Sequence, residues 1–294
     1  MEPKSPSGRR IIGIAALRKD AHEAPHTPDA PLKRRRSSRL ATKDDVTPQQ
    51  PAAQVMVDAL APTLYTPAPP PSFLTLQDLE RGGQHLQQAD PVLAPLIQEH
   101  GLPTQLLSRP GVSPFSALVK SVVYQQLHGK AAATIHARLL DLCGVAAEQE
   151  LSALTPGLVL AQSTADLRRC GLSERKAAYV LGLAHAFGPG RQLSDEGVRG
   201  MDDLQLLQAL TALKGVGPWT VHMVSIFNLG RPDVLPVGDL AVRKGMQLLY
   251  QLPDPVTAAD MERVAEAWRP YRSLGAYYMW RVPAASSSTP SRKK

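Results

Sequence analysis

Cysteine is scarce in this chain of 294 residues, which contains only Cys143 and Cys170. A small fold stapled by disulfides needs several cysteine pairs, and zinc or iron–sulfur sites of the four-cysteine kind need twice as many thiols. The sequence therefore excludes both classes. Aromatic residues are also few, at 5% of the chain, but the 43% of hydrophobic residues is enough to build a core.

Long apolar runs are missing as well. No stretch approaches the roughly eighteen uninterrupted apolar residues that predict a membrane-spanning helix. The N-terminus lacks the charged-then-apolar order of a secretory signal. We expect a soluble intracellular protein that has no membrane partner and is a monomer.

The formal net charge of +7 is unevenly distributed along the chain. Residues 1–45 carry a net charge of +5 and residues 283–294 a net charge of +3, whereas Lys/Arg and Asp/Glu are equal in number between 73 and 282. If the central segment binds nucleic acid, it must use locally placed groups rather than an overall positive field.

The two ends have the composition of disordered segments. Residues 1–72 are rich in Pro, Ser, Ala and charge and close with "APTLYTPAPPPS", so we expect a disordered basic and Pro-rich arm, and residues 283–294 predict a similar basic tail. The stretch "KRRRSSR", Lys33 to Arg39, is compatible with a solvated tail, a nuclear-import signal or a sequence-independent DNA tether. We take it to indicate a nuclear protein.

Residues 73–282 predict an all-α fold. Apolar residues recur at spacings of three and four residues, as on one face of a helix. Ser, Thr or Asp stand at the predicted helix starts and Gly at the helix ends. In one segment Ser113 is the expected N-cap, Pro114 the first helical residue and Gly129 the end of the helix. No segment alternates as a strand does. We predict a compact domain of about ten short helices in two lobes.

The segment "LKGVGPWT" predicts a hairpin between two helices. Helix N-termini offer unpaired amides and favour anions, and glycine lets a phosphate approach the backbone. The hairpin can therefore bind a DNA phosphate without reading sequence, although a Gly-containing turn between packed helices is also common. The residues assigned to this contact are Lys214, Gly215, Val216 and Gly217.

About twenty residues later "PVGDLAVRKG" presents a single acid, Asp239, directly before a predicted helix. By itself this acid is compatible with a helix N-cap. Together with the hairpin, the sequence resembles the helix–hairpin–helix Gly/Pro-Asp (HhH-GPD) superfamily of DNA glycosylases. "SPFSALVKSVVYQQLHGKAA", "GLSERKAAYVLGLA" and "AWRPYRSLGAYYMWR" resemble, in that order, helices of bacterial and yeast 3-methyladenine DNA glycosylases, so the resemblance covers roughly residues 85–282.

The resemblance implies a base-excision repair enzyme that flips an alkylated purine, such as 3-methyladenine or 7-methylguanine, out of damaged double-stranded DNA and hydrolyses its N-glycosidic bond. Asp239 matches the catalytic acid of the family. Purines alkylated at N3 or N7 are cationic and can leave without protonation, so a carboxylate that stabilises the oxocarbenium-like sugar and orients water is sufficient. In members that also cleave the backbone, a lysine two residues after the second hairpin glycine attacks C1′. Trp219 stands there, which implies a monofunctional enzyme that leaves an abasic site.

A cationic flipped base should stack on aromatic rings. The candidates for this pocket, each also compatible with core packing, are Trp219, Tyr124, Trp268, Tyr271 and Tyr278. The family inserts a wedge into the vacated stack from the loop after the Tyr124 helix, which here contains Gln126, Leu127 and His128. No partner stands at ligand spacing to make His128 a metal ligand.

Further DNA contacts are expected at two helix starts. Ser173, Arg175 and Lys176 are compatible with an N-cap and solvated charges or with phosphate contact, and Arg243 and Lys244 with DNA contact or packing against the acid. No cofactor is required. By resemblance, a structural Na⁺ or K⁺ would bind at the hairpin through the carbonyl oxygens of Thr211, Leu213 and Val216.

Two alternatives remain open at this point. One is a glycosylase of the same fold for deaminated or oxidised bases, whose neutral leaving group would need activation that no residue here clearly supplies. The other is a non-catalytic protein that binds damaged DNA. A simple clamp would need the hairpin glycines but not Asp239.

Overall fold

The chain folds into helices where its apolar pattern predicts them. The computed structural model describes residues 73–108, 111–146, 153–188 and 190–282, and the predicted basic arm, its stretch from Lys33 to Arg39 and the C-terminal tail lie outside these ranges. Within the described ranges there is no strand, which confirms the all-α prediction. The elements are α2 (Leu76–Ala89), η1 (Pro91–Leu93), α3 (Ala94–His100), η2 (Thr104–Leu106), α4 (Pro114–Tyr124), α5 (Gly129–Leu142), α7 (Pro156–Leu160), α8 (Thr164–Arg169), α9 (Glu174–Phe187), α10 (Asp195–Gly200), α11 (Asp203–Thr211), α12 (Pro218–Phe227), α13 (Leu240–Tyr250), α14 (Ala258–Ala265), η4 (Glu266–Trp268) and α15 (Arg272–Met279).

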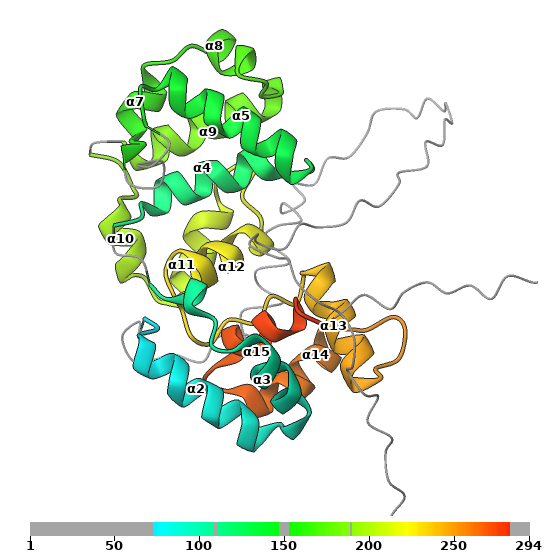
Figure 1. The fold of residues 1–294 in the computed structure, drawn as a ribbon. Helices are drawn as coiled ribbons and strands as arrows, with labels where there is room; N and C mark the ends of the chain where they lie inside the picture. Colours follow the sequence, from blue (N-terminus) through cyan, green and yellow to red (C-terminus); the bar gives the residue numbers. More distant parts are fainter. Residues whose placement is uncertain (1–72, 109–110, 147–152, 189, 283–294) are drawn as a thin grey trace, which may run out of the picture.

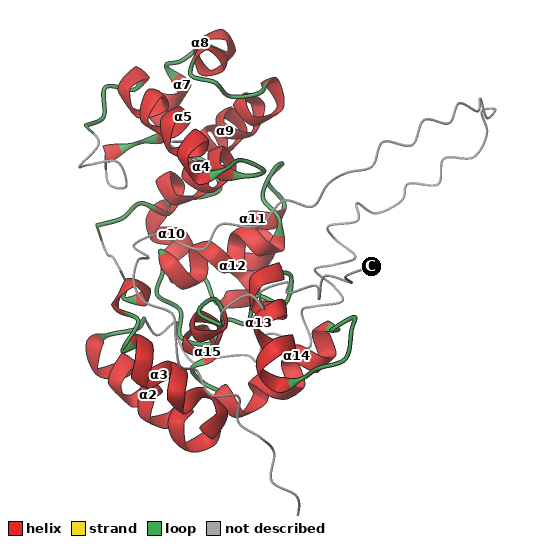
Figure 2. Cartoon of the chain, turned by 45° about the vertical axis from the view of Figure 1, so that its right-hand side comes forward, coloured by secondary structure: helices red, strands yellow, loops and turns green. Residues whose placement is uncertain are grey.

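Two hydrophobic cores divide these helices into two lobes (Figure 1). The first lobe is built by α4, α5 and α7 to α11, and the second by α2, α3 and α13 to α15. Helix α12 lies between the lobes, since Val221 and Val224 pack into the first core and Ile226 into the second. A second view shows the same central place for α11 and α12 (Figure 2). No helix in the described part of the chain is long and apolar enough to span a membrane.

The boundaries of α4 show where local signals succeed and fail. Ser113 caps the helix as predicted, and its side chain accepts the amide of Ser116 at 3.1 Å. The helix ends at Tyr124 rather than at Gly129, which instead begins α5. Gln125 already leaves the helical backbone with a ψ of 129°, and Gln126 after it adopts a φ of 56°, so the helix stops before the glycine is reached. The prediction placed the helix end several residues too late.

A buried arginine connects the lobes. Arg231, in the loop after α12, is 3% exposed and donates from Nη2 to the carbonyl oxygens of Arg199 at 3.2 Å and Met201 at 2.6 Å. Asn228 at the end of α12 donates to the carbonyl of Val112 at 3.4 Å. Two hydrogen bonds from a buried guanidinium to backbone carbonyls resist separation of the segments that they join. The helices that carry the predicted hairpin and acid are thereby held in a defined arrangement.

Candidate functional site

The hairpin joins α11 to α12 through a turn that only glycine fits. Gly215 has a φ of 89°, and a Cβ atom there would lie 2.3 Å from Cδ2 of the Tyr179 ring. The amide of Val216 donates to the carbonyl of Leu213 at 3.1 Å and closes the turn. The backbone conformation and the close approach of α9 therefore both require glycine at this position.

The N-terminus of α12 is open in the way that anion binding needs. Gly217 is its N-cap and supplies no side-chain hydrogen bond, and Pro218 occupies the first turn. Lys214 is exposed beside this end, whereas Val216 is 5% exposed. The first amides of the helix thus have no side-chain cap and lie next to a cation, an arrangement suited to a backbone phosphate.

Asp239 is the N-cap of α13 and is 4% exposed. Its Oδ1 accepts the amides of Ala241 and Val242, each at 2.9 Å. The indole Nε1 of Trp280 donates to the same oxygen at 3.0 Å, and that of Trp219 donates to Oδ2 at 2.7 Å. Asp239 is therefore a helix N-cap, which is the local interpretation that the sequence allowed. In addition, its carboxylate accepts hydrogen bonds from two indoles, one in α12 and one directly after α15.

These contacts hold a negative charge in a defined place. Hydrogen bonds to an ionised acceptor are stronger than neutral ones, and the positive end of a helix interacts favourably with a carboxylate. Oδ1 is saturated by three donors, but Oδ2 accepts one N–H from Trp219 and keeps lone-pair capacity for a further partner. The group is suited to stabilise positive charge that develops beside it.

Helices α12, α13 and α15 converge on this carboxylate. Trp280 follows α15 and lies against Phe227, the last residue of α12, with ring centroids 5.3 Å apart. Helix α13 approaches α15 so closely that a Cβ atom on Gly245 would lie 2.4 Å from the carbonyl oxygen of Met279. The close packing of these helices brings the second indole within reach of Asp239.

Sequence reasoning missed Trp280. Trp280 lies in the segment "AWRPYRSLGAYYMWR", of which the prediction includes Trp268, Tyr271 and Tyr278 but not Trp280. The available signal was its position at the end of the last helix, where neighbours cover a side chain least. Trp280 is half-buried, in contrast to Trp268 and Tyr278.

Two of the predicted pocket residues belong to the core of the second lobe. Trp268 is fully buried and donates from its indole to Oδ2 of Asp90 at 2.8 Å. Tyr278 is also fully buried, and its hydroxyl donates to the carbonyl of Gly101 at 2.9 Å. Both rings have their polar atom satisfied internally and offer no face to a ligand. Their assignment to a base pocket was wrong.

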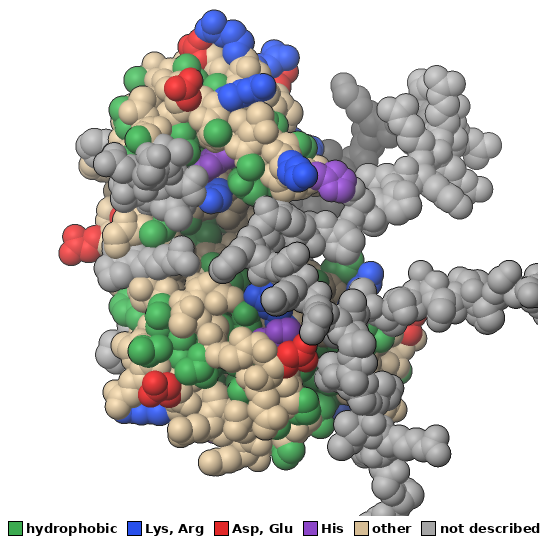
Figure 3. All heavy atoms as spheres, viewed as in Figure 1, with side chains coloured by type: hydrophobic (Ala, Val, Ile, Leu, Met, Phe, Trp, Pro, Cys, Tyr) green, Lys and Arg blue, Asp and Glu red, His purple; other side chains and the backbone are tan. Residues whose placement is uncertain are grey.

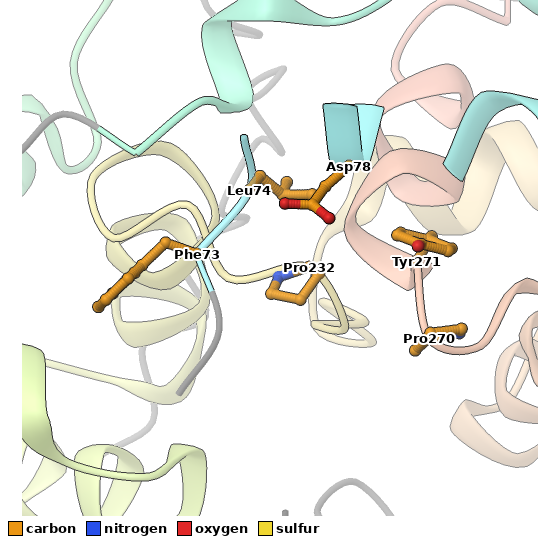
Figure 4. Close-up of a pocket in the computed structure, with 6 residues that line it drawn as sticks. All are labelled: Phe73, Leu74, Asp78, Pro232, Pro270 and Tyr271. Atoms are coloured by element: carbon orange, nitrogen blue, oxygen red, sulfur yellow. The ribbon is translucent and has the colours of Figure 1, made fainter. Parts of the chain in front are cut away.

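Tyr271 lines a different surface. It packs on Gly82 of α2 and lies 5.7 Å from the His85 ring between centroids. Figure 4 shows it in a small cavity of about 110 Å³, whose lining residues are Phe73, Leu74, Asp78, Pro232, Pro270 and Tyr271. Asp239 is not among them, and the volume is below the roughly 300 Å³ of ordinary ligand pockets. The assignment of Tyr271 to the base pocket stays a prediction.

Tyr124 and the predicted wedge residues lie together at the junction of α4 and α5. Tyr124 is half-buried, meets the His136 ring edge-on at 6.2 Å and has the Lys120 ammonium 5.8 Å from its ring centroid. The loop that follows is exposed at all three wedge candidates, Gln126, Leu127 and His128. An exposed apolar side chain on a short, strained loop fits insertion into a base stack.

The other expected DNA contacts differ in exposure. Arg175, Arg243 and Lys244 are exposed, and Ser173 is the N-cap of α9 and accepts the amide of Lys176 at 3.3 Å. Lys176 is not a solvated charge, because backbone carbonyls of the first lobe hold its half-buried ammonium. The expected phosphate contact by Lys176 is corrected to an internal one. On the face drawn in Figure 3, basic and acidic side chains are interspersed rather than gathered by sign.

The described residues contain no group of three or more His, Cys, Asp or Glu side chains that could hold a metal ion. Such a group consists of side chains only, and a monovalent cation can also be bound by backbone carbonyl oxygens such as those of the hairpin. The Leu213 carbonyl accepts one amide and retains a second lone pair, and Thr211 directs its own hydroxyl to the Leu207 carbonyl at 2.7 Å. The cation ligands expected from the sequence, the carbonyl oxygens of Thr211, Leu213 and Val216, stay a prediction.

Comparison with known proteins identifies the family of the chain. The sequence model described as "HhH-GPD superfamily base excision DNA repair protein" matches residues 119–270. That range includes the wedge loop, the hairpin, Trp219 and Asp239, and it ends before Trp280. The match spans more than half of the chain.

Individual relatives agree with the family match. DNA-3-methyladenine glycosylase 1 of Schizosaccharomyces pombe is 32% identical over 182 residues, which cover 62% of this chain and 78% of the relative. A solved structure of an S. pombe 3-methyladenine DNA glycosylase in complex with abasic DNA matches with a TM-score of 0.58 and 30% identity, covering 68% of this chain and 95% of that one. A DNA-3-methyladenine glycosidase from Bacillus halodurans matches with a TM-score of 0.57 and 32% identity, covering 68% and 88%.

Proposed function

Since the chain belongs to the HhH-GPD superfamily of base excision DNA repair proteins, we propose that it is a DNA-3-methyladenine glycosylase. It hydrolyses the N-glycosidic bond of alkylated purines, mainly 3-methyladenine and 7-methylguanine, in double-stranded DNA. The names of its relatives support this substrate class. The observation that carries the proposal is the Asp239 carboxylate, buried at a helix N-terminus and bonded to two indoles.

The chemistry follows from the charge of the substrate. A purine alkylated at N3 or N7 is already cationic, so it departs from C1′ without a general acid. Positive charge then develops on the sugar, and the Asp239 carboxylate stabilises it and orients the attacking water. Preorganised electrostatic stabilisation of this kind is worth on the order of 3 kcal/mol or more in a site shielded from water.

Trp219 supports the monofunctional part of the proposal. An indole is no nucleophile, so the position that holds a lysine in lyase-type members cannot form a Schiff base here. Instead, its N–H orients Asp239. The product is an abasic site in an intact strand. The ring remains the best placed aromatic for stacking on the flipped cationic base, with Tyr124 next to the wedge loop as the second.

DNA binding rests on local groups in this proposal, because segment 73–282 has no net charge. The amides at the start of α12 and Lys214 bind a phosphate, and exposed Arg175, Arg243 and Lys244 add further contacts. The exposed Leu127, with Gln126 and His128 beside it, fills the space that the flipped base vacates. The protein acts as a monomer, and the basic stretch in residues 33–39 directs it to the nucleus.

A monovalent cation completes the hairpin. Sodium or potassium would be held by the carbonyl oxygens of Thr211, Leu213 and Val216 and would supply positive charge between hairpin and phosphate. Affinity for DNA measured at constant ionic strength should then fall when tetramethylammonium replaces potassium. An unchanged affinity would remove the cation from the proposal.

The decisive experiment is single-turnover release of free base from DNA treated with a methylating agent. The wild-type protein should release 3-methyladenine and leave abasic strands uncut, and Asp239→Asn should lose most of the rate while it still binds DNA. Tight binding without release by either protein would instead support a non-catalytic damage-binding protein, with Asp239 acting only as a cap.

A further inference from the structure

Helix α9 contacts both the wedge loop and the hairpin from a single face. Lys176, in its first turn, donates from Nζ to the carbonyl oxygens of Val123 at 2.7 Å and Gln125 at 2.6 Å. These carbonyls lie at the end of α4, directly before the wedge candidates. The ammonium thus meets the negative end of the α4 dipole and satisfies carbonyls that the helix leaves open.

One turn further along α9, Tyr179 packs on the hairpin. Its ring is so close to Gly215 that the glycine has no room for a side chain. Residues three apart project from the same face of a helix, so Lys176 and Tyr179 point to neighbouring targets. One face of α9 therefore contacts the loop through the ammonium of Lys176 and the hairpin through the ring of Tyr179.

Gln125 closes this arrangement. Its side-chain Nε2 donates to the carbonyl oxygen of Gly215 at 2.8 Å, while its own backbone carbonyl accepts from Lys176. The loop and the hairpin are 90 residues apart in the chain, yet this hydrogen bond joins them directly. The loop, the hairpin and α9 thus each contact the other two.

The loop needs such support because its backbone is strained. Gln126 is not glycine and has a φ of 56°, a conformation that is unfavourable for residues with a Cβ atom. Strained residues persist where surrounding contacts over-determine them. A wedge must also hold its position against the DNA, because unstacking a base costs free energy.

We propose that Lys176 and Gln125 are positioning residues that hold the wedge loop at a set distance from the hairpin. The phosphate bound by the hairpin and the base step entered by the loop are then a fixed distance apart on the DNA. Neither residue touches the reacting atoms. The inference rests on the proposed wedge role of residues 126–128, and it assigns Lys176 a function other than phosphate contact.

The geometry separates this role from direct DNA binding. Two of the three ammonium protons of Lys176 are directed to protein carbonyls, and the side chain is half-buried. Burial also lowers the pKa of the Lys176 ammonium, with the neighbouring Arg175 charge contributing in the same direction. A lysine that served mainly as a phosphate ligand would extend into solvent.

The test compares two duplexes that carry one 7-methylguanine, either paired with cytosine or opposite an abasic-site analogue. The paired lesion must be flipped against base pairing, whereas the second has lost its partner and flips more easily. Single-turnover base release is measured for wild type, Lys176→Met, Gln125→Met and Lys176→Arg. Arg81→Met is the matched control, because it also removes one positive charge, from an exposed arginine that pairs with Asp78 on α2 of the second lobe.

Lys176→Met should slow release from the paired duplex about tenfold, as expected for the loss of hydrogen bonds from a charged group, and Gln125→Met should act in the same direction. Release from the partnerless duplex should change far less. Lys176→Arg should retain most of the activity, because a guanidinium can donate to both carbonyls. Equal losses on the two duplexes, or no loss on either, would overturn the inference; the second variant decides the matter if the first does not fold.

Leu127→Ala separates this inference from the function on which it rests. If Leu127→Ala slows release from the paired duplex selectively while Lys176→Met and Gln125→Met do not, only the positioning role fails. If Leu127→Ala shows no selective loss, the wedge assignment is wrong. If the wild type releases no base from either duplex, the proposed glycosylase activity itself fails.

Discussion

Trp219 and Asp239 are joined by a hydrogen bond of 2.7 Å from the indole Nε1 to Oδ2, although they lie twenty residues apart in the chain. Trp219 belongs to α12, the helix that follows the hairpin, and Asp239 caps the next helix. The helix whose N-terminus is proposed to bind a DNA phosphate therefore also donates a hydrogen bond to the acid. This relationship gives the first prediction.

Trp219→Phe keeps an aromatic ring for stacking and removes the N–H that Asp239 accepts. Because a hydrogen bond to a charged group contributes about 1.5–3 kcal/mol, the single-turnover rate should fall about tenfold to a hundredfold. Trp268→Phe is the control, since it removes an indole bond to the buried Asp90 instead. It should lower the melting temperature and leave the rate of the folded enzyme unchanged. A rate unaffected by Trp219→Phe would contradict the orienting role.

The two hairpin glycines should respond differently to alanine. Gly215→Ala places a Cβ into the Tyr179 ring at a positive φ and should lower the free energy of unfolding by more than 1 kcal/mol, about the cost of left-handed backbone alone. Gly217 has ordinary backbone and no heavy atom within 4 Å of an added Cβ. Gly217→Ala should therefore fold normally but bind DNA more weakly, because its methyl group stands before the α12 amides. Urea unfolding and DNA titration measure the two effects; equal stability losses would argue against this division.

His222 should make the protein sensitive to acid. It is fully buried on α12, neither ring nitrogen has a hydrogen-bond partner among the described residues, and burial, reinforced by Arg272, lowers its pKa to about 4. Its unfolded pKa is near 6.5, so the unfolded state binds more protons between pH 6.5 and pH 4 and stability falls as the pH drops through that window. The loss from pH 7 to pH 5 should be on the order of 2 kcal/mol.

His222→Leu should remove this dependence. Urea unfolding of both proteins at pH 7 and pH 5 provides the measurement. A wild-type protein as sensitive to this pH change as the variant would show that other groups are responsible.

Both thiols should resist alkylation in the folded state. Cys143 and Cys170 are buried, and burial raises the pKa of both thiols, that of Cys143 to about 11. Because the thiolate is the nucleophile, a rise of about two pKa units lowers its population about a hundredfold at neutral pH. Iodoacetamide labelling followed by mass spectrometry should be slow in buffer and fast in denaturant. Rapid labelling of the native protein would show that the thiols are accessible.

The basic N-terminal arm should contribute to DNA affinity through salt-dependent contacts. Binding of the full chain should weaken steeply as salt increases, since Lys and Arg release counterions from DNA. A protein that begins at residue 73 should bind more weakly and with a shallower slope of log K against log salt. If affinity and slope both survive the truncation, the arm does not act as a tether.

Much of the fold and part of the site could be predicted because their signals are local. Ser113, Ser173 and Asp239 all cap helices, and each does so through amides within three residues of its own position. The hairpin is likewise defined by a few adjacent residues, in which Gly215 supplies the left-handed backbone. Signals of this range are legible in a sequence because the interacting groups are neighbours in it.

Tertiary structure decided the roles of residues whose partners are distant in the chain. Trp268 and Trp280 are the same residue type twelve positions apart, yet Trp268 donates to Asp90 in the core and Trp280 donates to Asp239 in the site. Lys176, expected to contact a phosphate, instead donates to the carbonyl oxygens of Val123 and Gln125. Local pattern alone cannot distinguish these outcomes, because the packing of α9, α12 and α15 determines which buried polar group lies within hydrogen-bonding distance of each side chain.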